Sequence, residues 1–272
     1  MAQVSWLKVP TELKITKNNM ASTANFESKF FTIEPTFDVK DWAAAQPVLE
    51  EFFEKSSSEE GCFFYGFTKV GDKLFCREGY VNGEAVLAHL QNVAAPFAKI
   101  LAGPASLDKL EFHAPASELD KVKEATAALN PVFFEVDSGF TKVTKEAGGT
   151  QTPQSMVSLH PRFTVKDWAA AQPIMAEFVE KTATEGSCLY YGWTKNENTL
   201  LCRESYTDAC GVLAHLENVG PLLDKMLAGP AALDSISIHG PAAELEKLKE
   251  ATAALGTVYF EVVDGSFSRY EV

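Results

Sequence analysis

The sequence lacks the long apolar run and the excess of positive charge that mark membrane and nucleic-acid-binding proteins. It contains no stretch of about 18 apolar residues, and residues 1–30 lack the apolar core of a secretory signal. Lys and Arg number 24 against 37 Asp and Glu, which gives a formal net charge of −13. Because phosphate groups repel such a chain, we expect no nucleic-acid partner and no membrane insertion.

Cofactor and metal motifs are also missing from the sequence. It contains no GxGxxG, Walker loop, GxSxG or HExxH, which argues against most dinucleotide-binding, nucleotide-binding, α/β-hydrolase and zinc-peptidase assignments. No group of His, Cys and carboxylate residues has the sequence spacing of a metal site. We therefore expect neither a cofactor nor a metal.

The cysteines do not suit a disulfide framework. The five cysteines are Cys62, Cys76, Cys188, Cys202 and Cys210. Their number is odd, no CxxC occurs, and a turn at Gly71–Asp72 places Cys76 opposite residue 66 or 67, too far from Cys62 to bridge. We expect reduced thiols and an intracellular, cytoplasmic protein. The weakly basic residues 8–17 leave two interpretations, a solvated tail or an organelle address such as a plastid one.

The sequence contains one unit twice. VKDWAAAQP occurs at Val39–Pro47 and again at Val165–Pro173, a shift of 126 residues. At that shift CREGY returns as CRESY and VLAHLQNV returns as VLAHLENV, and more than half of positions 37–136 are identical. We assign residues 1–29 to an N-terminal extension, 30–140 to a first repeat, 141–157 to a polar linker and 158–272 to a second repeat.

Each repeat is predicted to be an α+β unit of ferredoxin-like order, βαββαβ plus an extra helix and strand. In the first repeat the apolar spacing predicts a strand over 30–37, a helix that begins near Asp38 or Asp41, a hairpin of strands 62–70 and 73–81, a helix over 84–101, a strand over 107–113, a helix over 117–129 and a strand over 132–136.

The hairpin has apolar residues on both faces. Alternation places Phe63, Tyr65 and Phe67 on one face, and Cys62 and Phe64 on the other. Since neither face suits water, helices should cover one and the sheet of the other repeat should cover the second. We therefore predict an intramolecular pseudo-dimeric α/β barrel, and further homodimerisation of the chain stays open.

Three short motifs recur in both repeats. They are GCFFYGF at 61–67 with SCLYYGW at 187–193, Arg-Glu-x-Tyr at 77–80 and 203–206, and Ala-His-Leu at 88–90 and 214–216. Together with the element order, they resemble the antibiotic-biosynthesis-monooxygenase (ABM) type of dimeric α/β barrel. The resemblance covers most of both repeats. It implies this barrel fold, and it implies an activity like the cofactor-independent oxygenation of quinols and polyketide phenols, or haem degradation, that similar proteins carry out.

His89 and His215 are the first candidates for chemistry. Each lies at the edge of an apolar helical stripe, where an imidazole can face a cleft between helix and sheet. With an ordinary pKa near 6.5, such a ring could act as a general base. The alternative is a structural histidine that bonds a backbone group or Glu78.

Glu78 and Glu204 are the candidate catalytic carboxylates. Each lies between apolar neighbours on a strand, which is unfavourable unless the carboxylate is paired, either with His89 or with an arginine such as Arg77. A structural ion pair is the alternative role. The candidate substrate-contacting residues, which could equally be core, are Tyr65, Tyr191, Phe67, Trp193, Tyr80 and Tyr206. Asn92 and Asn218 lie one turn after the histidines and beyond the buried stripe, so they are not placed among the candidates. His113 and His239 are assigned structural roles.

Two functions of different classes follow. The first is a cofactor-independent monooxygenase that binds a small apolar or aromatic molecule, a quinol or phenol, between helix and sheet. The second is a non-catalytic module of the same fold that binds a small ligand or stabilises an assembly.

Overall fold

The computed structural model describes residues 30–143, 152–153 and 156–269. The predicted N-terminal extension, with its basic stretch, and most of the predicted linker therefore lie outside the described residues. The elements of the first repeat are β1 (Phe31–Val39), α1 (Trp42–Ser56), β2 (Cys62–Val70), β3 (Lys73–Tyr80), α2 (Gly83–Asn92), α3 (Ala94–Leu101), β4 (Ala105–Ala114), α4 (Ala116–Thr126) and β5 (Val132–Thr141).

The second repeat follows the same order. Its elements are β7 (Val157–Val165), α5 (Trp168–Ala183), β8 (Cys188–Asn196), β9 (Thr199–Tyr206), α6 (Ala209–Leu227), β10 (Ala231–Gly240), α7 (Ala242–Leu248) and β11 (Val258–Val262). Two short strands are β6 (Thr152–Pro153) and β12 (Phe267–Ser268), and single 3₁₀ turns lie at Ala127–Leu129 and Ala253–Leu255. This order confirms the predicted fold class.

Capping residues and prolines set the helix ends. Asp41 begins α1 by accepting a hydrogen bond from the Ala44 backbone N–H at 3.0 Å, and Asp167 does the same for α5. The helix predicted over 84–101 is divided at Val93, which places Pro96 in the first turn of α3, where its missing N–H leaves no bond unmade.

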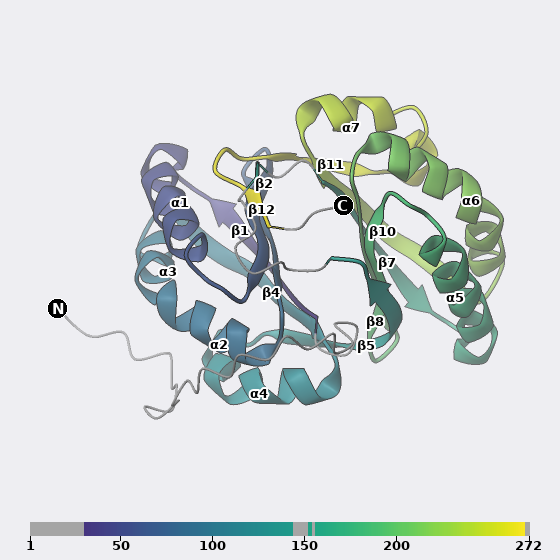
Figure 1. The fold of residues 1–272 in the computed structure, drawn as a ribbon, viewed down its shortest axis with the longest axis horizontal. Coiled ribbons are helices and arrows are strands. Elements are labelled where there is room, and N and C mark those ends of the chain that lie inside the picture. The colour runs from purple at the N-terminus through teal and green to yellow at the C-terminus, as the bar shows by residue number, and fades with distance from the viewer. Residues whose placement is uncertain (1–29, 144–151, 154–155, 270–272) are drawn as a thin grey trace.

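Ten of the described strands close into a barrel. The order around it is β11-β10-β7-β9-β8-β5-β4-β1-β3-β2, and β2 then pairs with β11. The two seams use the last strand of each repeat: β5 pairs with β4 and with β8 of the other repeat, and β11 pairs with β10 and with β2. In Figure 1 the helices lie on the outer sides of two facing sheets. The predicted pseudo-dimeric barrel is confirmed, and β5 runs five residues past the predicted 132–136 to reach the second repeat.

A β-bulge corrects the predicted faces of β2. The register shifts between Cys62 and Phe64, so Cys62 joins Tyr65 and Phe67 in the core under the helices. Phe63 instead packs with Phe64 between the two repeats. A bulge inserts one residue into a strand, and period-two alternation gives no sign of where it lies. The free state predicted for the cysteines is confirmed, and Cys210 is the exposed one.

Gly139, at the seam between β5 and β8, has no room for a side chain. Its φ is 149°, and a Cβ there would lie 2.4 Å from the Tyr191 carbonyl oxygen. We expect Gly139→Ala to lower the free energy of unfolding by about 2 kcal/mol or more, through strain and separation of the seam. Gly220→Ala is the control, because nothing lies within 4 Å of its Cβ. Urea denaturation of both variants tests this, and equal stabilities would contradict it.

Candidate functional site

Each repeat contains an apolar cavity between its helices and the outer face of its sheet. In the cavity of the first repeat about 40 Å³ admits the centre of a water molecule, within a wider region of about 420 Å³ outside atoms that is partly open to solvent. Tyr65, Phe67, Glu78 and His89 line it. The remaining lining is Ile33, Pro35, Phe37, Phe52, Leu90, Val93, Phe97, Leu110 and Leu129. A carboxyl group and an imidazole thus lie in a largely apolar space.

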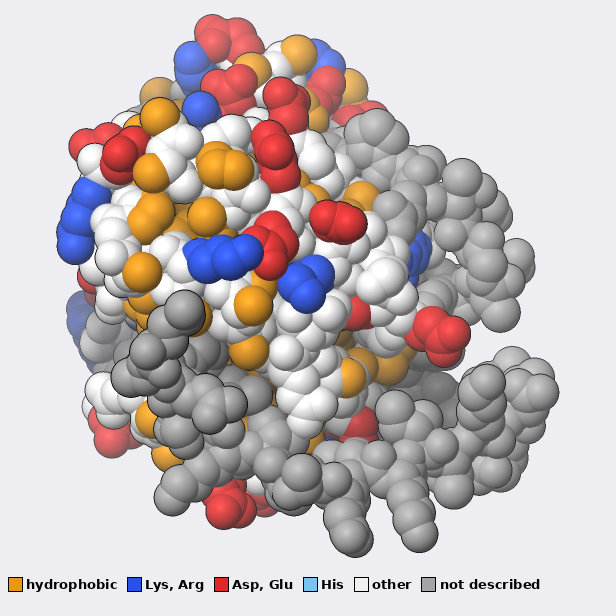
Figure 2. All heavy atoms as spheres, turned by 90° about the vertical axis from the view of Figure 1, so that its left-hand side faces the viewer, with side chains coloured by type: hydrophobic (Ala, Val, Ile, Leu, Met, Phe, Trp, Pro, Cys, Tyr) orange, Lys and Arg blue, Asp and Glu red, His pale blue; other side chains and the backbone are white. Residues whose placement is uncertain are grey.

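His89 is fixed between two carboxylates. Helix α2 turns it toward the sheet with Val86, three residues earlier, and the ring is 3% exposed. Its Nε2 lies 3.1 Å from Glu78 Oε2, and its Nδ1 lies 3.0 Å from each carboxylate oxygen of Glu59. Figure 2, which views the face that carries the first repeat's helices, accordingly shows no histidine among the described side chains.

The two carboxylates determine the charge of His89. Burial alone would lower the pKa of the imidazole, but Glu78 and Glu59 outweigh burial and raise the pKa of His89 to about 9. The ring is therefore an imidazolium at neutral pH. This overturns the assumption of an ordinary pKa near 6.5, on which its candidacy as a resting general base was built.

Glu78 uses one carboxylate oxygen for its contacts. Tyr80 Oη donates a hydrogen bond of 2.5 Å to Oε2, the same oxygen that faces His89. Among the described residues, no partner contacts Glu78 Oε1. Burial, followed by the charge of Glu78, holds the pKa of Tyr80 well above its ordinary value, so its hydroxyl stays a donor. The predicted pairing of Glu78 with His89, rather than with Arg77, is what the structure contains.

The second repeat reproduces the arrangement with a different lining. His215 Nε2 lies 3.2 Å from Glu204 Oε2, and Tyr206 Oη donates to the same oxygen at 2.5 Å. Its cavity lies in a region of about 460 Å³ outside atoms that is also partly open to solvent. Trp193 replaces Phe67 in its wall and donates a hydrogen bond to the Met175 carbonyl at 3.3 Å. The two cavities therefore share their charged groups and differ in shape.

Sequence reasoning missed the residues that complete each cluster. Glu59 and Glu185 hold Nδ1 of the two histidines. Asn92 and Asn218, which the position beyond the helical stripe had excluded as candidates, donate to these carboxylates at 2.8 and 2.7 Å. The available signal was that Glu59 and Glu185 match within an otherwise divergent stretch, SSSEE against TATEG. Tyr80 and Tyr206 contact the candidate carboxylates Glu78 and Glu204, whereas Tyr65, Tyr191, Phe67 and Trp193 line the cavities.

Each cluster is also supported by the other repeat. After β12, which pairs with β2, Arg269 donates to the carbonyl oxygens of Ser57, Glu59 and Cys62. After β5, Lys142 Nζ donates to the Glu185 carbonyl at 2.6 Å. The loops that carry the two outer carboxylates are thus tied down across the repeat boundary.

Arg269→Ala should change the protonation of one histidine and not the other. With three carbonyl partners lost, the loop that carries Glu59 becomes freer, and we expect the pKa of His89 to fall from about 9 by about one pH unit. His215 should be unaffected. An NMR titration of the imidazole resonances measures both, and an unchanged pKa of His89 would show that Arg269 does not position Glu59.

Comparison with protein-family models and with curated proteins gives no match. Solved structures do match. A proposed monooxygenase from Fusobacterium nucleatum is 14% identical over 78% of this chain and 90% of its own, with a TM-score of 0.53. A proposed monooxygenase from Lactobacillus acidophilus is 16% identical over 78% and 91%, with a TM-score of 0.50.

The chain has the ABM fold. Both matches cover most of the chain, so the ABM fold extends over the two repeats together. MupZ from Pseudomonas fluorescens is 34% identical over 41% of this chain and 93% of its own, with a TM-score of 0.39.

None of the helices in the described part of the chain is both long and apolar enough to cross a membrane.

Proposed function

We propose that the chain is an oxygenase that oxidises a small phenol or quinol in its helix–sheet cavities, with no bound cofactor. The observation that carries the proposal is the same in both repeats. A buried carboxylate with one uncommitted oxygen lies beside a histidine whose pKa the neighbouring carboxylates raise, and both side chains line an apolar cavity. A base and a cation in a dry space suit the formation of an organic anion. The monooxygenase descriptions of the two structural matches support the same class of reaction.

The first step is removal of the phenol proton. Oε1 of Glu78 is the proton acceptor, because Oε2 is occupied by His89 and Tyr80. The imidazolium of His89 then offsets the negative charge that develops on the substrate. Since the ring is cationic at rest, we assign it the role of charge partner and proton donor, and we assign the role of base to the carboxylate. Glu204 and His215 act likewise in the second repeat.

The remaining steps balance without another reactant. The phenolate passes an electron to O₂, and the radical pair joins into a C–O bond at a ring carbon that carries hydrogen. His89 protonates the resulting peroxide anion and, now neutral, removes the hydrogen from that carbon as a proton. The O–O bond breaks, and the departing hydroxide takes the proton from Glu78. Phenol and O₂ thus yield quinone and water, and both side chains return to their resting states.

Oxygen uptake with a panel of phenols and quinols tests this proposal. We expect Glu78→Gln/Glu204→Gln to lower the rate by about 10²–10⁴-fold, the usual contribution of a general base. Glu246→Gln, which alters an exposed carboxylate, should leave the rate unchanged. Near-UV circular dichroism would confirm that the variants are folded. Parental rates in the double variant would overturn the assignment of the base.

The narrowness of the cavities favours one alternative. Only about 40 Å³ of each admits a water centre, so an aromatic ring must displace lining side chains to enter. A non-catalytic module that binds a small apolar ligand requires only that the lining side chains move aside, and it requires no reaction. Binding of phenols without oxygen uptake by the intact chain would favour the module over the enzyme.

A further inference from the structure

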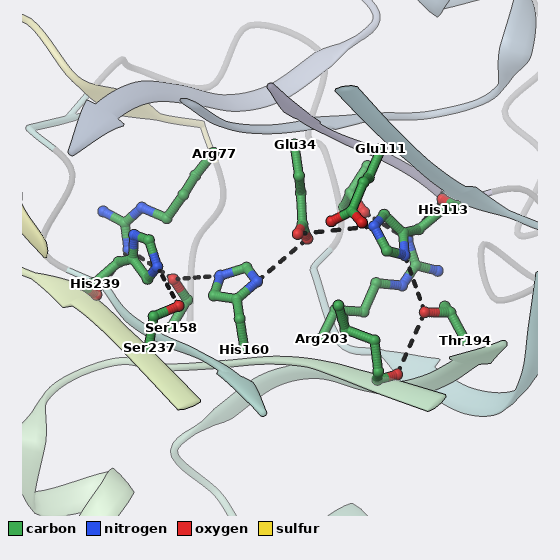
Figure 3. Close-up of polar contacts among 12 residues, drawn as sticks. Glu34, Arg77, Glu111, His113, Ser158, His160, Thr194, Arg203, Ser237 and His239 are labelled. Carbon is green, nitrogen blue, oxygen red and sulfur yellow. Dashed lines mark hydrogen bonds and ion pairs between the residues drawn. The ribbon is translucent and has the colours of Figure 1, made fainter. Parts of the chain in front are cut away.

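A separate cluster of ligand-type side chains lies inside the barrel, between the two sheets. Glu34, on β1, and Glu111 and His113, on β4, each present one donor atom, and these atoms all lie within 4.8 Å of one another. Their exposed fractions are 3%, 2% and 0%. Figure 3 shows Glu34 reaching into the space between the two sheets, with the ring of His113 on one side and that of His160 on the other. None of these residues lines the helix–sheet cavities.

Glu34 is a buried carboxylate whose polar contacts, among the described residues, are two histidine rings at long distances. Within the described chain, its contacts are His113 Nε2 at 3.7 Å and His160 Nδ1 at 3.3 Å. Both ring nitrogens are buried and make no hydrogen bond in the described structure. A carboxylate out of water is strongly destabilised unless a cation or several donors satisfy it. Glu34 therefore needs a positive charge beside it, which either a proton on a neighbouring ring or a bound cation supplies.

The second ring nitrogen of His113 faces Glu34 with a lone pair. Thr194 Oγ1 donates its hydrogen to the Leu201 carbonyl, so it accepts from His113 Nδ1–H at 2.9 Å. In the neutral ring Nε2 then carries the lone pair, and it lies 3.7 Å from the Glu34 carboxylate. This separation is longer than a hydrogen bond, so the two groups do not satisfy each other directly.

The second repeat contains an internal comparison. His239, the counterpart of His113, bonds Thr68 through Nδ1 at 2.7 Å, and its Nε2 lies 2.8 Å from the Ser237 hydroxyl. Ser237 is the counterpart of Glu111. A hydroxyl thus satisfies the ring in the second repeat, whereas carboxylates surround it in the first.

We propose that Glu34, Glu111 and His113 bind a first-row divalent cation of the Zn²⁺ class, at a structural site inside the barrel. Ligand atoms about 2.0–2.2 Å from a tetrahedral metal lie about 3.3–3.6 Å apart, close to the 3.7 Å between Glu34 and His113 and longer than a normal hydrogen bond. Imidazole nitrogen with carboxylate oxygen suits Zn²⁺. Arg162 and Lys109 hold Glu111, at 2.7 and 3.0 Å, as partners outside the coordination sphere.

Metal content after refolding tests the site. The full chain is unfolded, refolded with ZnCl₂ or with a chelator, desalted and analysed for bound metal. We expect about one Zn²⁺ per chain in the parent, because a site enclosed by the fold is filled during folding. His113→Asn, which keeps a donor at the position of Nδ1 and removes Nε2, should lose most of this metal, and so should Glu34→Gln. His239→Asn makes the matched change in the second repeat and should retain it.

A Co²⁺ spectrum keeps the test decisive if a variant fails to fold. Cysteine thiolates also bind these metals, and they add an intense near-ultraviolet charge-transfer band that nitrogen and oxygen ligands do not. The proposal predicts visible Co²⁺ bands without the thiolate band in the parent chain. A parent that retains no metal, a thiolate spectrum, or full retention by both His113→Asn and Glu34→Gln would each overturn it.

Discussion

At pH 7, replacing His89 by glutamine should lower the free energy of unfolding by about 3–5 kcal/mol, the usual effect of removing one partner from a buried ion pair. Glutamine can keep a hydrogen bond to Glu78 but supplies no charge. Glu59 and Glu78, with side chains 11% and 4% exposed, would then face each other across a neutral group. Chemical denaturation measures the loss.

The control for this variant removes a cation at the surface. Lys99 pairs with Glu51 at 2.5 Å, with side chains 57% and 26% exposed. Lys99→Gln should lower stability by less than about 1 kcal/mol, because water screens such pairs. If the two substitutions had equal effects, the carboxylates around His89 would not need its charge.

The same ion pair gives stability a defined pH dependence. The folded-state pKa of His89, about 9, lies above its ordinary value of 6.5, so its contribution is complete below pH 6.5 and is lost as pH rises through 9. Between pH 6 and 8.5 we expect the difference in free energy of unfolding between the parent and His89→Gln to shrink by about 2 kcal/mol. Subtracting the variant removes the effect of groups common to both proteins. A constant difference would contradict the raised pKa.

Replacing Arg203 by methionine should lower the free energy of unfolding by about 3 kcal/mol, because buried acceptors then lose their donor. The guanidinium, 5% exposed, donates to Thr32 Oγ1 and the His113 carbonyl at 2.9 Å, and to the Phe30 carbonyl at 3.4 Å. All three acceptors belong to the other repeat. The bond network thus holds the two sheets together from inside the barrel.

Arg77 provides the matched variant for this prediction. It donates from the first repeat to Ser158 Oγ and the His239 carbonyl, both at 2.9 Å. Arg77→Met should therefore have an effect like that of Arg203→Met, whereas the exposed Lys166→Met should stay within about 0.5 kcal/mol of the parent. Thermal or urea unfolding compares the three. A loss below about 0.5 kcal/mol for both arginines would show that they do not join the repeats.

The sequence was sufficient for the barrel because the repeat itself carries the information. Strand Cys62–Val70 has apolar residues on both faces, so both faces must be shielded from water. Helices of the same repeat shield one face, and the sheet of the other repeat shields the second. That Glu78 needs a partner could also be predicted, since it lies between apolar neighbours, but the sequence left His89 and Arg77 as alternatives. The structure contains the pair with His89.

Other features depended on residues that meet only in the folded chain. Glu59 lies in a loop with no periodic pattern, and its contact with His89 spans 30 positions, so the raised pKa could not be anticipated. Glu34 and His113 are likewise far apart in sequence, and no ligand spacing reveals them. The bulge after Cys62 does not change the apolar pattern of the sequence, so it could not be predicted from that pattern.

The imidazole resonances of the five histidines test the central claim most directly. Phenol is titrated into the full chain, and the ring signals of every histidine are followed by NMR. We predict that His89 and His215 move saturably with phenol while His113, His160 and His239, inside the barrel, stay still. Fixed signals for His89 and His215 at phenol concentrations that move the others would contradict the assignment of the helix–sheet cavities as the sites of function.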